Sequence, residues 1–435
     1  MVDQRRIDDQ RWVDAATAAR HLGISVRSLY AYVSRGRVRS MPGEHGRPRR
    51  YALADLERLR VRRDARAGHG AVAAGALRWG EPVLDSAITA ITARGPAYRG
   101  RLAVELAASG TPFENVAELL WSGYLPEARV AWPRSAIPLA QVARLVGPDP
   151  RSPLDVMPLL IQIAAMADPE RGDLRPDALI ARGRRLIPLL AAALAPGFVP
   201  AAVSRALGAT SVAEIAARAI GVADELAPVL DRVLVLLADH ELNASSFTAR
   251  ITASTGADPY ACVAAALATL SGPKHGSASE QVARFADGIG SPEAARAAVR
   301  ALRKRGELPP EFGHPLYPAG DPRGRAVLDL VAELPATRRG RTLVAIIEAM
   351  IDATSEATPN VDVGLAALTA ALGVAPWVGT GLFAVARAAG WLAHALEQRA
   401  TGQLMRPRAR YTGPPVMSLG LPGSAGSLGL PGPVR

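Results

Sequence analysis

The sequence is poor in cysteine, aromatic residues and lysine, and each shortage narrows the classes of protein to consider. Its single cysteine, Cys262, lies in an apolar run and cannot form an internal disulfide, so we expect a small core residue in a reducing cytoplasm. Aromatic residues make up only 5% of the 435 positions, whereas Ala and Leu dominate. Because regular polar–apolar alternation is also scarce, we predict a mainly α protein with a closely packed core. Only two residues are lysines, which leaves the basic chemistry of the chain to arginine.

A secretory leader and a clear membrane span are missing as well. The opening ten residues, MVDQRRIDDQ, are polar and charged, which is not the pattern of a signal peptide. The uncharged stretch from residue 363 to 386 is long enough to cross a bilayer, but the segment GVAPWVGTG interrupts it. We therefore expect two buried helices joined by a turn at that place, no membrane partner, and a cytoplasmic protein.

The positive charge of the protein is concentrated at its N-terminal end. The whole chain carries a formal net charge of +11, and residues 1–70 alone hold sixteen arginines against eight acidic residues, a net of +8. A length of 435 residues predicts two or three structural units. The uneven charge therefore favours a basic N-terminal head, with a function of its own, on a nearly neutral body.

Apolar residues at helical spacing predict two short helices in this head. The first would carry Ala15, Ala16, Ala19 and Leu22, and the second, capped by Ser25, would bury Val26, Leu29, Tyr30 and Val33. Gly23 provides the turn between them. The arginine-rich segment MPGEHGRPRRY then suits a β-wing, and ALADLERLRVR suits a closing helix.

Over roughly residues 11–62 this pattern resembles the winged helix-turn-helix domains of the MerR/excisionase type. In such domains the second helix enters the major groove of DNA. The resemblance implies DNA contacts from the second helix and the wing, by Arg27, Ser28, Tyr32, Arg35, Arg47, Arg49 and Arg50. A small helical appendage with a solvated basic face is the alternative. We place this head at residues 1–62, with DNA as its predicted partner.

Two segments of low complexity flank the body. Residues 63–78 are rich in Ala and Gly, which predicts a linker. Residues 415–435 repeat Leu-Gly-Leu-Pro-Gly without a burial pattern, which predicts a disordered tail. The body is then expected to span residues 79–414.

Three of the seven histidines fall in polar breaks between apolar helices. His240 lies in LLADHELNASS, His275 in SGPKHGSAS and His314 in EFGHPLYPAGDPRG, and a fourth break, TPNVDVG, carries Asp362. Taken singly, each has a structural explanation, since a histidine can satisfy the carbonyls at a helix end and an aspartate can cap a helix. Together they could also ligate zinc, but their spacings are long, and nearby arginines would repel a cation and attract an anionic substrate.

From about residue 81 to 411 the body resembles citrate synthase in seven stretches that occur in the family's order. They are YRGRLAVELAASGTPFENVAELLWSGYLP, DHELNASSFTARITASTGAD, GPKHG, FGHPLYPAGDPR, PNVD, AVARAAGWLAHALEQ and RPRARYTG. The resemblance implies a citrate synthase-like, two-domain helical fold that closes over its substrates. The large domain would comprise about residues 79–272 and 366–414, and the small domain about residues 273–365.

The same resemblance implies the condensation of acetyl-CoA with oxaloacetate, followed by hydrolysis of the thioester to citrate and CoA. In that reaction Asp362 would remove a methyl proton, His275 would donate a hydrogen bond to the thioester oxygen, and His314 would polarise the oxaloacetate carbonyl. Oxaloacetate would be bound by His240, Arg323, Arg387 and Arg406. In the family the last of these arginines reaches into the partner's site, which implies a homodimer. No cofactor or metal ion is implied, because acetyl-CoA is a substrate.

Four residues near these motifs depart from the family's pattern and leave the substrate preference open. Lys274 stands in place of a usual apolar residue, Ser277 in place of a second glycine, and Pro315 and Leu316 in place of Arg-Val. A 2-methylcitrate synthase, which uses propionyl-CoA, is therefore one alternative. Another is a transcription regulator whose body senses oxaloacetate or acyl-CoA. The predicted base favours an enzyme, because binding alone does not require one.

Overall fold

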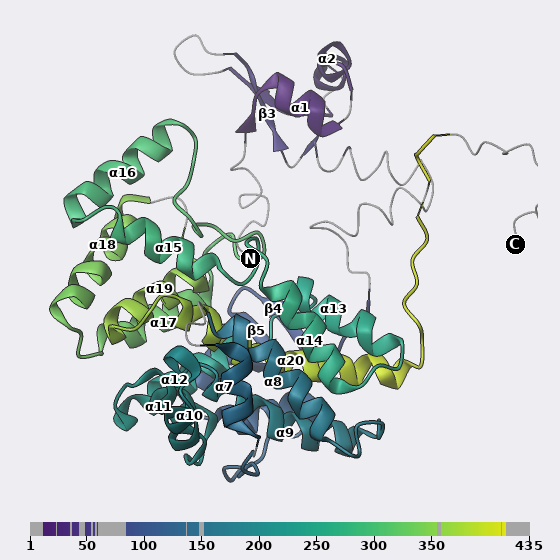
Figure 1. Cartoon of the computed structure of the whole chain (residues 1–435). Coiled ribbons are helices and arrows are strands. Elements are labelled where there is room, and N and C mark those ends of the chain that lie inside the picture. Colours follow the sequence, from purple (N-terminus) through teal and green to yellow (C-terminus); the bar gives the residue numbers. More distant parts are fainter. Residues whose placement is uncertain are drawn as a thin grey trace, which may run out of the picture. The chain divides into compact units, whose positions relative to one another are not determined.

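The computed structural model of the chain forms two compact units, Met1–Ser86 and Ala87–Arg435 (Figure 1). The structure describes residues 12–22, 24–34, 37–42, 48–53, 55–56, 59, 84–135, 137–147, 152–354, 358–409 and 411–414. The predicted linker, the predicted tail, Arg35 and Arg47 lie outside these residues.

The first unit contains the two helices that the sequence predicts, together with a small sheet. The predicted closing helix, ALADLERLRVR, lies largely outside the described residues. Its elements are β1 (Trp12–Val13), α1 (Ala15–Leu22), α2 (Val26–Ser34), β2 (Ser40–Met41) and β3 (Arg50–Ala52). The strand β3 pairs antiparallel with both β1 and β2. Ser25 caps α2 as predicted, since its Oγ accepts a 3.1 Å hydrogen bond from the Ser28 N–H. The unit has a core of its own, formed by Ala18, Leu22, Leu29, Val38, Tyr51 and Leu56.

The packing of α2 differs from the prediction at its two tyrosines. Tyr30, expected in the buried face, is 54% exposed, whereas Tyr32, expected to face DNA, packs against the core of the unit. The buried face centres on Leu29, and residues three and four positions further along a helix lie on the same side. Tyr32 and Val33 therefore join Leu29, and Tyr30 falls at the edge of the face.

The second unit is almost entirely helical, which confirms the predicted fold class. It opens with an antiparallel meander of β4 (Thr89–Thr92), β5 (Gly95–Tyr98) and β6 (Arg101–Leu102). Its helices are α5 (Ala103–Ala108), α6 (Phe113–Ser122), α7 (Leu139–Val146), α8 (Pro153–Ala167), α9 (Pro176–Ala192), α10 (Pro200–Leu207), α11 (Val212–Ile220), α12 (Ala227–Leu237), α13 (Ala244–Ser254), α14 (Pro259–Leu270), α15 (Ala278–Asp287), α16 (Pro292–Lys304), α17 (Pro322–Ala332), α18 (Arg338–Thr354), α19 (Val361–Leu372) and α20 (Trp377–Thr401).

Two groups of helices make up this second unit. In one group, at the left of Figure 1, α16 packs against α18, while α15, α17 and α18 pack against α19. The other group is built around α20, which contacts α9, α12, α13 and α14. The helix α19 continues without a break through residue 365, where the sequence analysis places the boundary between a small and a large domain.

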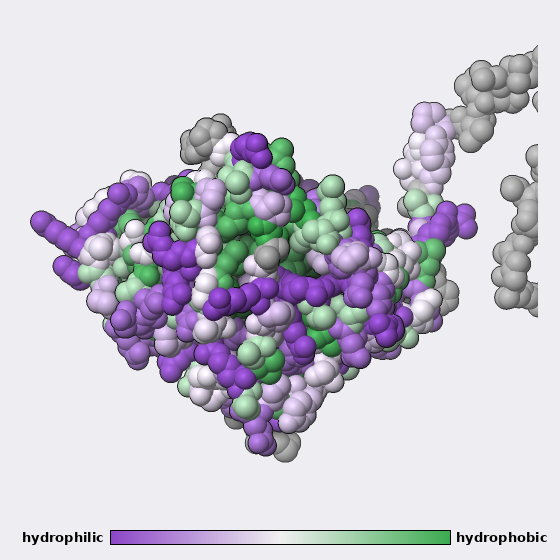
Figure 2. Space-filling view, turned by 60° about the horizontal axis from the view of Figure 1, so that its bottom comes forward, coloured by the Kyte–Doolittle hydropathy of each residue, from purple (hydrophilic) through white to green (hydrophobic). Residues whose placement is uncertain are grey.

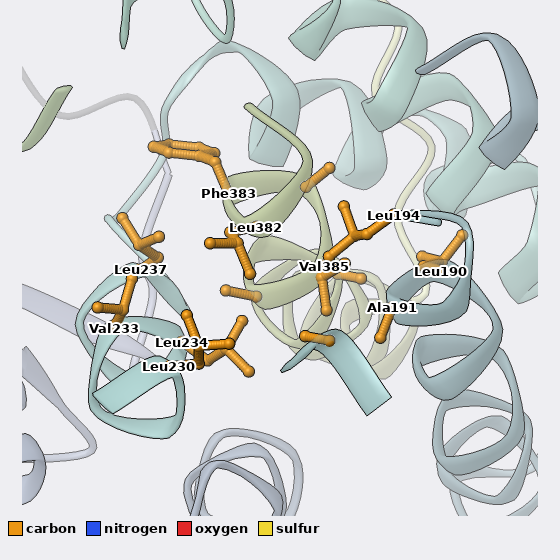
Figure 3. Close-up of a cluster of buried hydrophobic side chains, with 14 of the residues drawn as sticks. Leu190, Ala191, Leu194, Leu230, Val233, Leu234, Leu237, Leu382, Phe383 and Val385 are labelled. Carbon is orange, nitrogen blue, oxygen red and sulfur yellow. The ribbon is translucent and has the colours of Figure 1, made fainter. Parts of the chain in front are cut away.

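The helix α20 is the central element of the core because it is apolar on almost every side. Every residue from Val378 to Ala395 is buried. Figure 3 shows how its side chains meet those of α12 on one side and those at the end of α9 on the other. The labelled residues are Leu190, Ala191, Leu194, Leu230, Val233, Leu234, Leu237, Leu382, Phe383 and Val385. Any polar group on α20 is therefore buried and desolvated.

The long uncharged stretch is divided into two helices and a turn, as predicted. The helix α19 ends at Leu372, Gly373 follows with a φ of +68°, and α20 begins at Trp377. A left-handed glycine is a common way to end a helix, and here it redirects the chain into α20. In the part of the chain that the structure describes, no helix is both long and apolar enough to cross a membrane.

Candidate active site

His240 lies in the turn between α12 and α13, and two neighbouring elements hold this turn. The hydroxyl of Tyr98 on β5 lies 3.1 Å from the carbonyl oxygen of Asp239, and the Gly390 N–H of α20 donates a 3.1 Å hydrogen bond to the carbonyl of Ala238. A side chain at position 390 would meet Asp239 Oδ1 at 2.3 Å, so a glycine is needed for this close approach. The turn thereby holds His240 in a place where it is only 8% exposed.

His275 lies in a tight turn in which the chain folds back on the end of α14. The Gly276 N–H donates a 2.9 Å hydrogen bond to the carbonyl of Leu270, and a Cβ at position 276 would lie 2.4 Å from the same oxygen. The glycine after the histidine is therefore required by the turn itself. This turn places His275 Nε2 at 2.8 Å from Ser245 Oγ, in the first turn of α13.

The tautomer of His275 depends on the hydrogen bonds of the Ser245 hydroxyl. Trp391 Nε1 can only donate, and it donates to Ser245 Oγ at 3.0 Å. The hydroxyl proton is then available to one of two acceptors, Asn243 Oδ1 at 2.8 Å or His275 Nε2 at 2.8 Å. When it is donated to His275, the neutral ring carries its own proton on Nδ1 and donates from there.

His314, His240 and Tyr317 form a cluster of rings. The ring centroids of the two histidines are 5.5 Å apart, and the Tyr317 hydroxyl lies 2.8 Å from His240 Nε2. His314 Nδ1 accepts a 3.1 Å hydrogen bond from the Leu316 N–H. A neutral His314 therefore carries its proton on Nε2, which makes that nitrogen a hydrogen-bond donor.

Asp362 lies in the first turn of α19, which is capped by Asn360. The cap is a 2.9 Å hydrogen bond from the Asp362 N–H to Asn360 Oδ1. Within the described ranges, the buried Oδ1 of Asp362 has no hydrogen-bond partner. Burial raises the pKa of Asp362 to about 7, and the charge of Glu311 adds to this effect. A carboxyl group with this pKa is partly ionised at neutral pH and is a stronger base than an exposed aspartate.

Arg323 and Arg387 are buried guanidinium groups of the kind that bind carboxylates. Asp321 holds Arg323 through two hydrogen bonds, of 3.0 Å from Nε and 2.8 Å from Nη2. Arg387 donates from Nε to the Leu237 carbonyl at 2.9 Å, while its Nη2 has no hydrogen-bond partner among the residues described. Burial lowers the pKa of Arg387 to about 10, so the group stays charged at neutral pH. Its unpaired donor suits an anionic ligand.

Burial also keeps the three histidines of the site neutral. It lowers the pKa of His275 to about 4. It lowers those of His240 and His314 as well, and the charge of Arg323 is the next contributor for both. The positive charge of the site therefore rests on arginine. Nowhere in the described ranges do three His, Cys, Asp or Glu side chains gather as metal ligands.

Tyr317 brings three of the predicted site residues together. Its ring centroid lies 5.6 Å from that of His240, 5.0 Å from that of His314 and 5.9 Å from Arg323 Cζ. Arg323 lies in the first turn of α17, which begins just after the loop that carries His314 and Tyr317. The two histidines and the guanidinium of Arg323 therefore lie around the same tyrosine ring.

Phe383 joins two further predicted residues on the side of α20. Its ring lies 4.4 Å from Arg387 Cζ, and its centroid is 6.3 Å from that of His275. Asp362 is close enough to both the residues around Tyr317 and those around Phe383 to be affected by their arginines. The charges of Arg323 and Arg387 both lower the pKa of Asp362, although burial has the larger, opposite effect. Six of the seven predicted residues are thus linked within one region.

Arg406 is the predicted residue that the structure does not bring into this region. It is exposed in the segment after α20, where the Met405 N–H donates a 3.1 Å hydrogen bond to Ser254 Oγ. Ser254 ends α13, nine residues and about 14 Å from Ser245 at a rise of 1.5 Å per residue. Within its own chain, Arg406 therefore lies at the far end of α13 from His275.

Several residues that shape this site could not be predicted from the sequence. Tyr317 and Asp321 lie in the stretch EFGHPLYPAGDPRG, which the sequence marks only through its histidine and its arginine. Ser245 and Phe383 stand at ordinary positions of helices, and no pattern in the sequence points to them. Their contacts with the histidines arise only when distant segments meet.

In the head, four of the predicted DNA contacts have accessible positions. Arg27 and Ser28 are exposed on α2, and Arg49 and Arg50 are exposed at the beginning of β3. The arginines of the second helix and of the wing thus present charge to the solvent, where a polyanion could reach them.

The chain matches two families and several curated proteins. Residues 76–408 match the citrate synthase family, described as "Citrate synthase, C-terminal domain", and residues 12–63 match a helix-turn-helix domain. The citrate synthase of Mycolicibacterium smegmatis is 31% identical over 347 residues, which are 74% of this chain and 90% of that protein. Citrate synthase 2 of Bacillus subtilis is 40% identical over 187 residues, which are 42% of this chain. The chain thus spans about half the length of that relative, 50%.

Solved structures of citrate synthases share the fold of the body. The enzyme from Pyrobaculum aerophilum aligns with a TM-score of 0.67 and 26% identity over 78% of this chain and 92% of its own. The ternary complex of the Thermoplasma acidophilum enzyme with carboxymethyl coenzyme A and oxaloacetate aligns with a TM-score of 0.67 and 23% identity, over 78% of this chain and 95% of its own. From the family match over residues 76–408 and the relative at 31% identity, the chain belongs to the citrate synthase family.

Proposed function

We propose that this protein condenses acetyl-CoA with oxaloacetate and hydrolyses the product to citrate and CoA. The observation that carries the proposal is Asp362, whose pKa is raised to about 7 and whose buried Oδ1 has no hydrogen-bond partner in the described part of the chain. A buried carboxylate oxygen without a partner costs stability, and a functional role is one explanation for such a group. This oxygen can accept a proton from carbon. The likeness to citrate synthases at 31% and 26% identity supports the same reaction.

In the first step, Asp362 removes a proton from the methyl group beside the thioester carbonyl. The electron pair moves to the thioester oxygen, and the Nδ1–H of His275 donates a hydrogen bond to the enolate that forms. A positioned base contributes about 10²–10⁴-fold to such a step, and a preorganised donor at the developing charge adds to it. This donation needs the tautomer in which the Ser245 hydroxyl, 2.8 Å from His275 Nε2, donates to that nitrogen and not to Asn243 Oδ1.

In the second step, the enolate carbon attacks the ketone carbon of oxaloacetate. The two carboxylates of that substrate bind Arg323 and Arg387, and His240 borders the same substrate. The ketone oxygen accepts a hydrogen bond from the Nε2–H of His314 and takes up a proton as it becomes the hydroxyl group of the product. Water then cleaves the thioester, which leaves citrate and releases CoA as a thiol.

Propionyl-CoA is the alternative acyl substrate. One methylene group in an apolar pocket changes discrimination by only about 1–3 kcal/mol, so the same residues serve either thioester. Lys274, which departs from the family's pattern, is exposed, and nothing in the structure explains it. A regulator that only senses these metabolites is the alternative from another class, and it requires binding without turnover.

We further propose a homodimer in which Arg406 completes the site of the partner. This arginine is exposed and lies far from His275 in its own chain, as the position of Met405 beside Ser254 indicates. The apolar helices α8 and α14 leave part of their surface uncovered, including Met166, which is 82% exposed. Figure 2 shows hydrophobic residues gathered on one face of the molecule among hydrophilic ones. Surfaces of this kind are typical of contacts between chains.

We also propose that the head binds DNA. The match to a helix-turn-helix domain over residues 12–63 and the net charge of +8 over residues 1–70 support this proposal. The exposed arginines Arg27, Arg49 and Arg50 can bind phosphates or the edge of guanine.

The purified protein should release CoA from acetyl-CoA when oxaloacetate is present, as measured by detection of the free thiol. Asp362→Asn should lower kcat by about 10²–10⁴-fold, because an amide cannot take the proton. Asp352→Asn, at an exposed position of α18, should leave kcat unchanged.

A parallel assay with propionyl-CoA measures the acyl preference. Binding of oxaloacetate without release of CoA from either thioester would contradict the enzyme and favour the regulator.

The dimer can be tested by combining two inactive variants. Arg406→Ala and Asp362→Asn damage different halves of a shared site, so a mixed dimer contains one intact site. Co-expression should therefore recover about a quarter of the wild-type activity per subunit, because half of randomly assembled dimers are mixed. Co-expression of His275→Ala with Asp362→Asn is the matched control, since both changes fall in the same half and no activity should return. Absence of recovery in the first pair would argue against the shared site.

Binding of the protein to duplex DNA should weaken as salt is added. Replacement of Arg27, Arg49 and Arg50 by Ala should reduce the slope of log K against log salt by about 0.9 for each phosphate contact that is lost. Arg205→Ala, at an exposed position of α10, is the control and should leave the slope unchanged. An affinity that does not depend on salt, or a slope that the triple variant shares with the wild type, would contradict the proposed interface.

A further inference from the structure

Glu311 has an unusual backbone conformation three residues before His314. Its φ is +65°, in the left-handed region that residues other than glycine rarely adopt. The described chain contains four such residues, and two of them, Glu241 and Glu311, lie in the loops that carry His240 and His314. A strained residue of this kind persists only where its surroundings hold it, and such residues cluster at functional sites.

The contacts of Glu311 hold it against the segment that leads into α19. The backbone N–H of Asn360 donates a 3.2 Å hydrogen bond to the Glu311 carbonyl, and Phe312 forms an antiparallel bridge with Pro359. The Glu311 side chain adds a third link, because its Oε2 accepts a 2.7 Å hydrogen bond from Asn360 Nδ2. The loop of His314 is thus joined to the beginning of the helix that carries Asp362.

The amide of Asn360 connects Glu311 with Asp362. This amide is almost fully buried, at 6% exposure, and its Oδ1 accepts the 2.9 Å hydrogen bond from the Asp362 N–H. An ionised carboxylate can only accept, so the end of the amide that faces Glu311 is the nitrogen. The oxygen is then directed at the backbone of Asp362. Glu311 therefore fixes the orientation of the group that caps α19.

We propose that Glu311 is a positioning residue for Asp362, which it serves in two ways. It orients the Asn360 amide that holds the Asp362 backbone, and it holds a second carboxylate at Asn360, two residues before the base. The proposal rests on the proposed function in so far as Asp362 is the base of the reaction.

The charges around Asp362 show what the second carboxylate does. The charged groups with the largest effects on it are Glu311 and Asp321, which raise its pKa, and Arg323 and Arg387, which lower it. Burial is the largest influence, and Glu311 follows it. Removal of the charge of Glu311 should therefore lower the pKa of Asp362 without returning it to that of an exposed aspartate.

Two substitutions separate the two roles. Glu311→Gln removes the charge but keeps the length of the side chain and an oxygen that can accept from Asn360 Nδ2. Glu311→Gly removes both the charge and the hydrogen bond, and it relieves the left-handed conformation. Glu307→Gln, at an exposed position shortly before the same loop, is the control for loss of one negative charge.

The pH dependence of kcat is the first measurement. For Glu311→Gln, the rise of kcat with pH should move to lower pH by about half to one unit, as expected for the loss of one nearby charge of like sign. Glu311→Gly should show the same movement, and its plateau kcat should in addition fall about tenfold, with little change in KM and no loss of thermal stability. Glu307→Gln should follow the wild-type profile. A purely structural Glu311 predicts an unchanged profile in both variants.

The second measurement needs no turnover. A carboxyl group whose folded pKa lies above its unfolded value of about 4 destabilises the folded state progressively as pH rises from about 4 to the folded value, here about 7, and no further above it. The gain in melting temperature from Asp362→Asn should therefore grow between about pH 4 and about pH 7 and then level off. In the Glu311→Gln background the gain should level off at lower pH and reach a smaller final value.

The two measurements distinguish the possible failures. A wild type that releases no CoA while the melting curves show the movement would overturn the proposed function and leave the role of Glu311 standing. If the gain in melting temperature levels off at the same pH with and without Glu311→Gln, the role of Glu311 is overturned, whether or not the wild type is active. In an active protein, an unchanged kcat midpoint would overturn it as well.

Discussion

The exclusion of water from its ionisable groups is the constraint on which this site depends. Burial is the largest influence on the pKa of each of the groups concerned, which are His240, His275, His314, Asp362 and Arg387. Burial keeps the three imidazoles neutral, so that they act as hydrogen-bonding groups, and it makes the aspartate a stronger base. Arg387 stays charged, and its Nη2 has no partner among the described residues. If water entered the site, all of these pKa values would move back toward their ordinary values, because burial is their common cause.

The same close packing that forms the core produces this dry site. Glycines stand where a side chain would collide with a carbonyl oxygen of the site's loops. A Cβ would lie 2.6 Å from the Ala238 oxygen at Gly390, 2.4 Å from the Leu270 oxygen at Gly276 and 2.5 Å from the Asn360 oxygen at Gly324. Through these contacts α20, the turn after α14 and α17 come close to the loops of the site. A core rich in Ala and Gly and poor in aromatic residues is therefore a condition of the chemistry as well as of the fold.

The sequence predicts those features that have a local physical cause. A glycine that interrupts an apolar run ends a helix, so the division of residues 363–386 at Gly373 could be predicted, as could the cap by Ser25. Contacts between distant segments could not. Tyr317 meets His240 across 77 residues, and Ser245 meets His275 across 30. Tyr30 was placed wrongly because helical spacing defines a face but does not show where its edge lies.

We expect burial to make Asp362 a base that titrates near neutral pH. Infrared spectroscopy tests it directly, since a protonated carboxyl group and a carboxylate absorb at different frequencies, and the difference between the wild type and Asp362→Asn isolates this side chain. The carboxyl band of Asp362 should disappear with a midpoint near pH 7. A midpoint near 4, the ordinary value for an exposed aspartate, would contradict it.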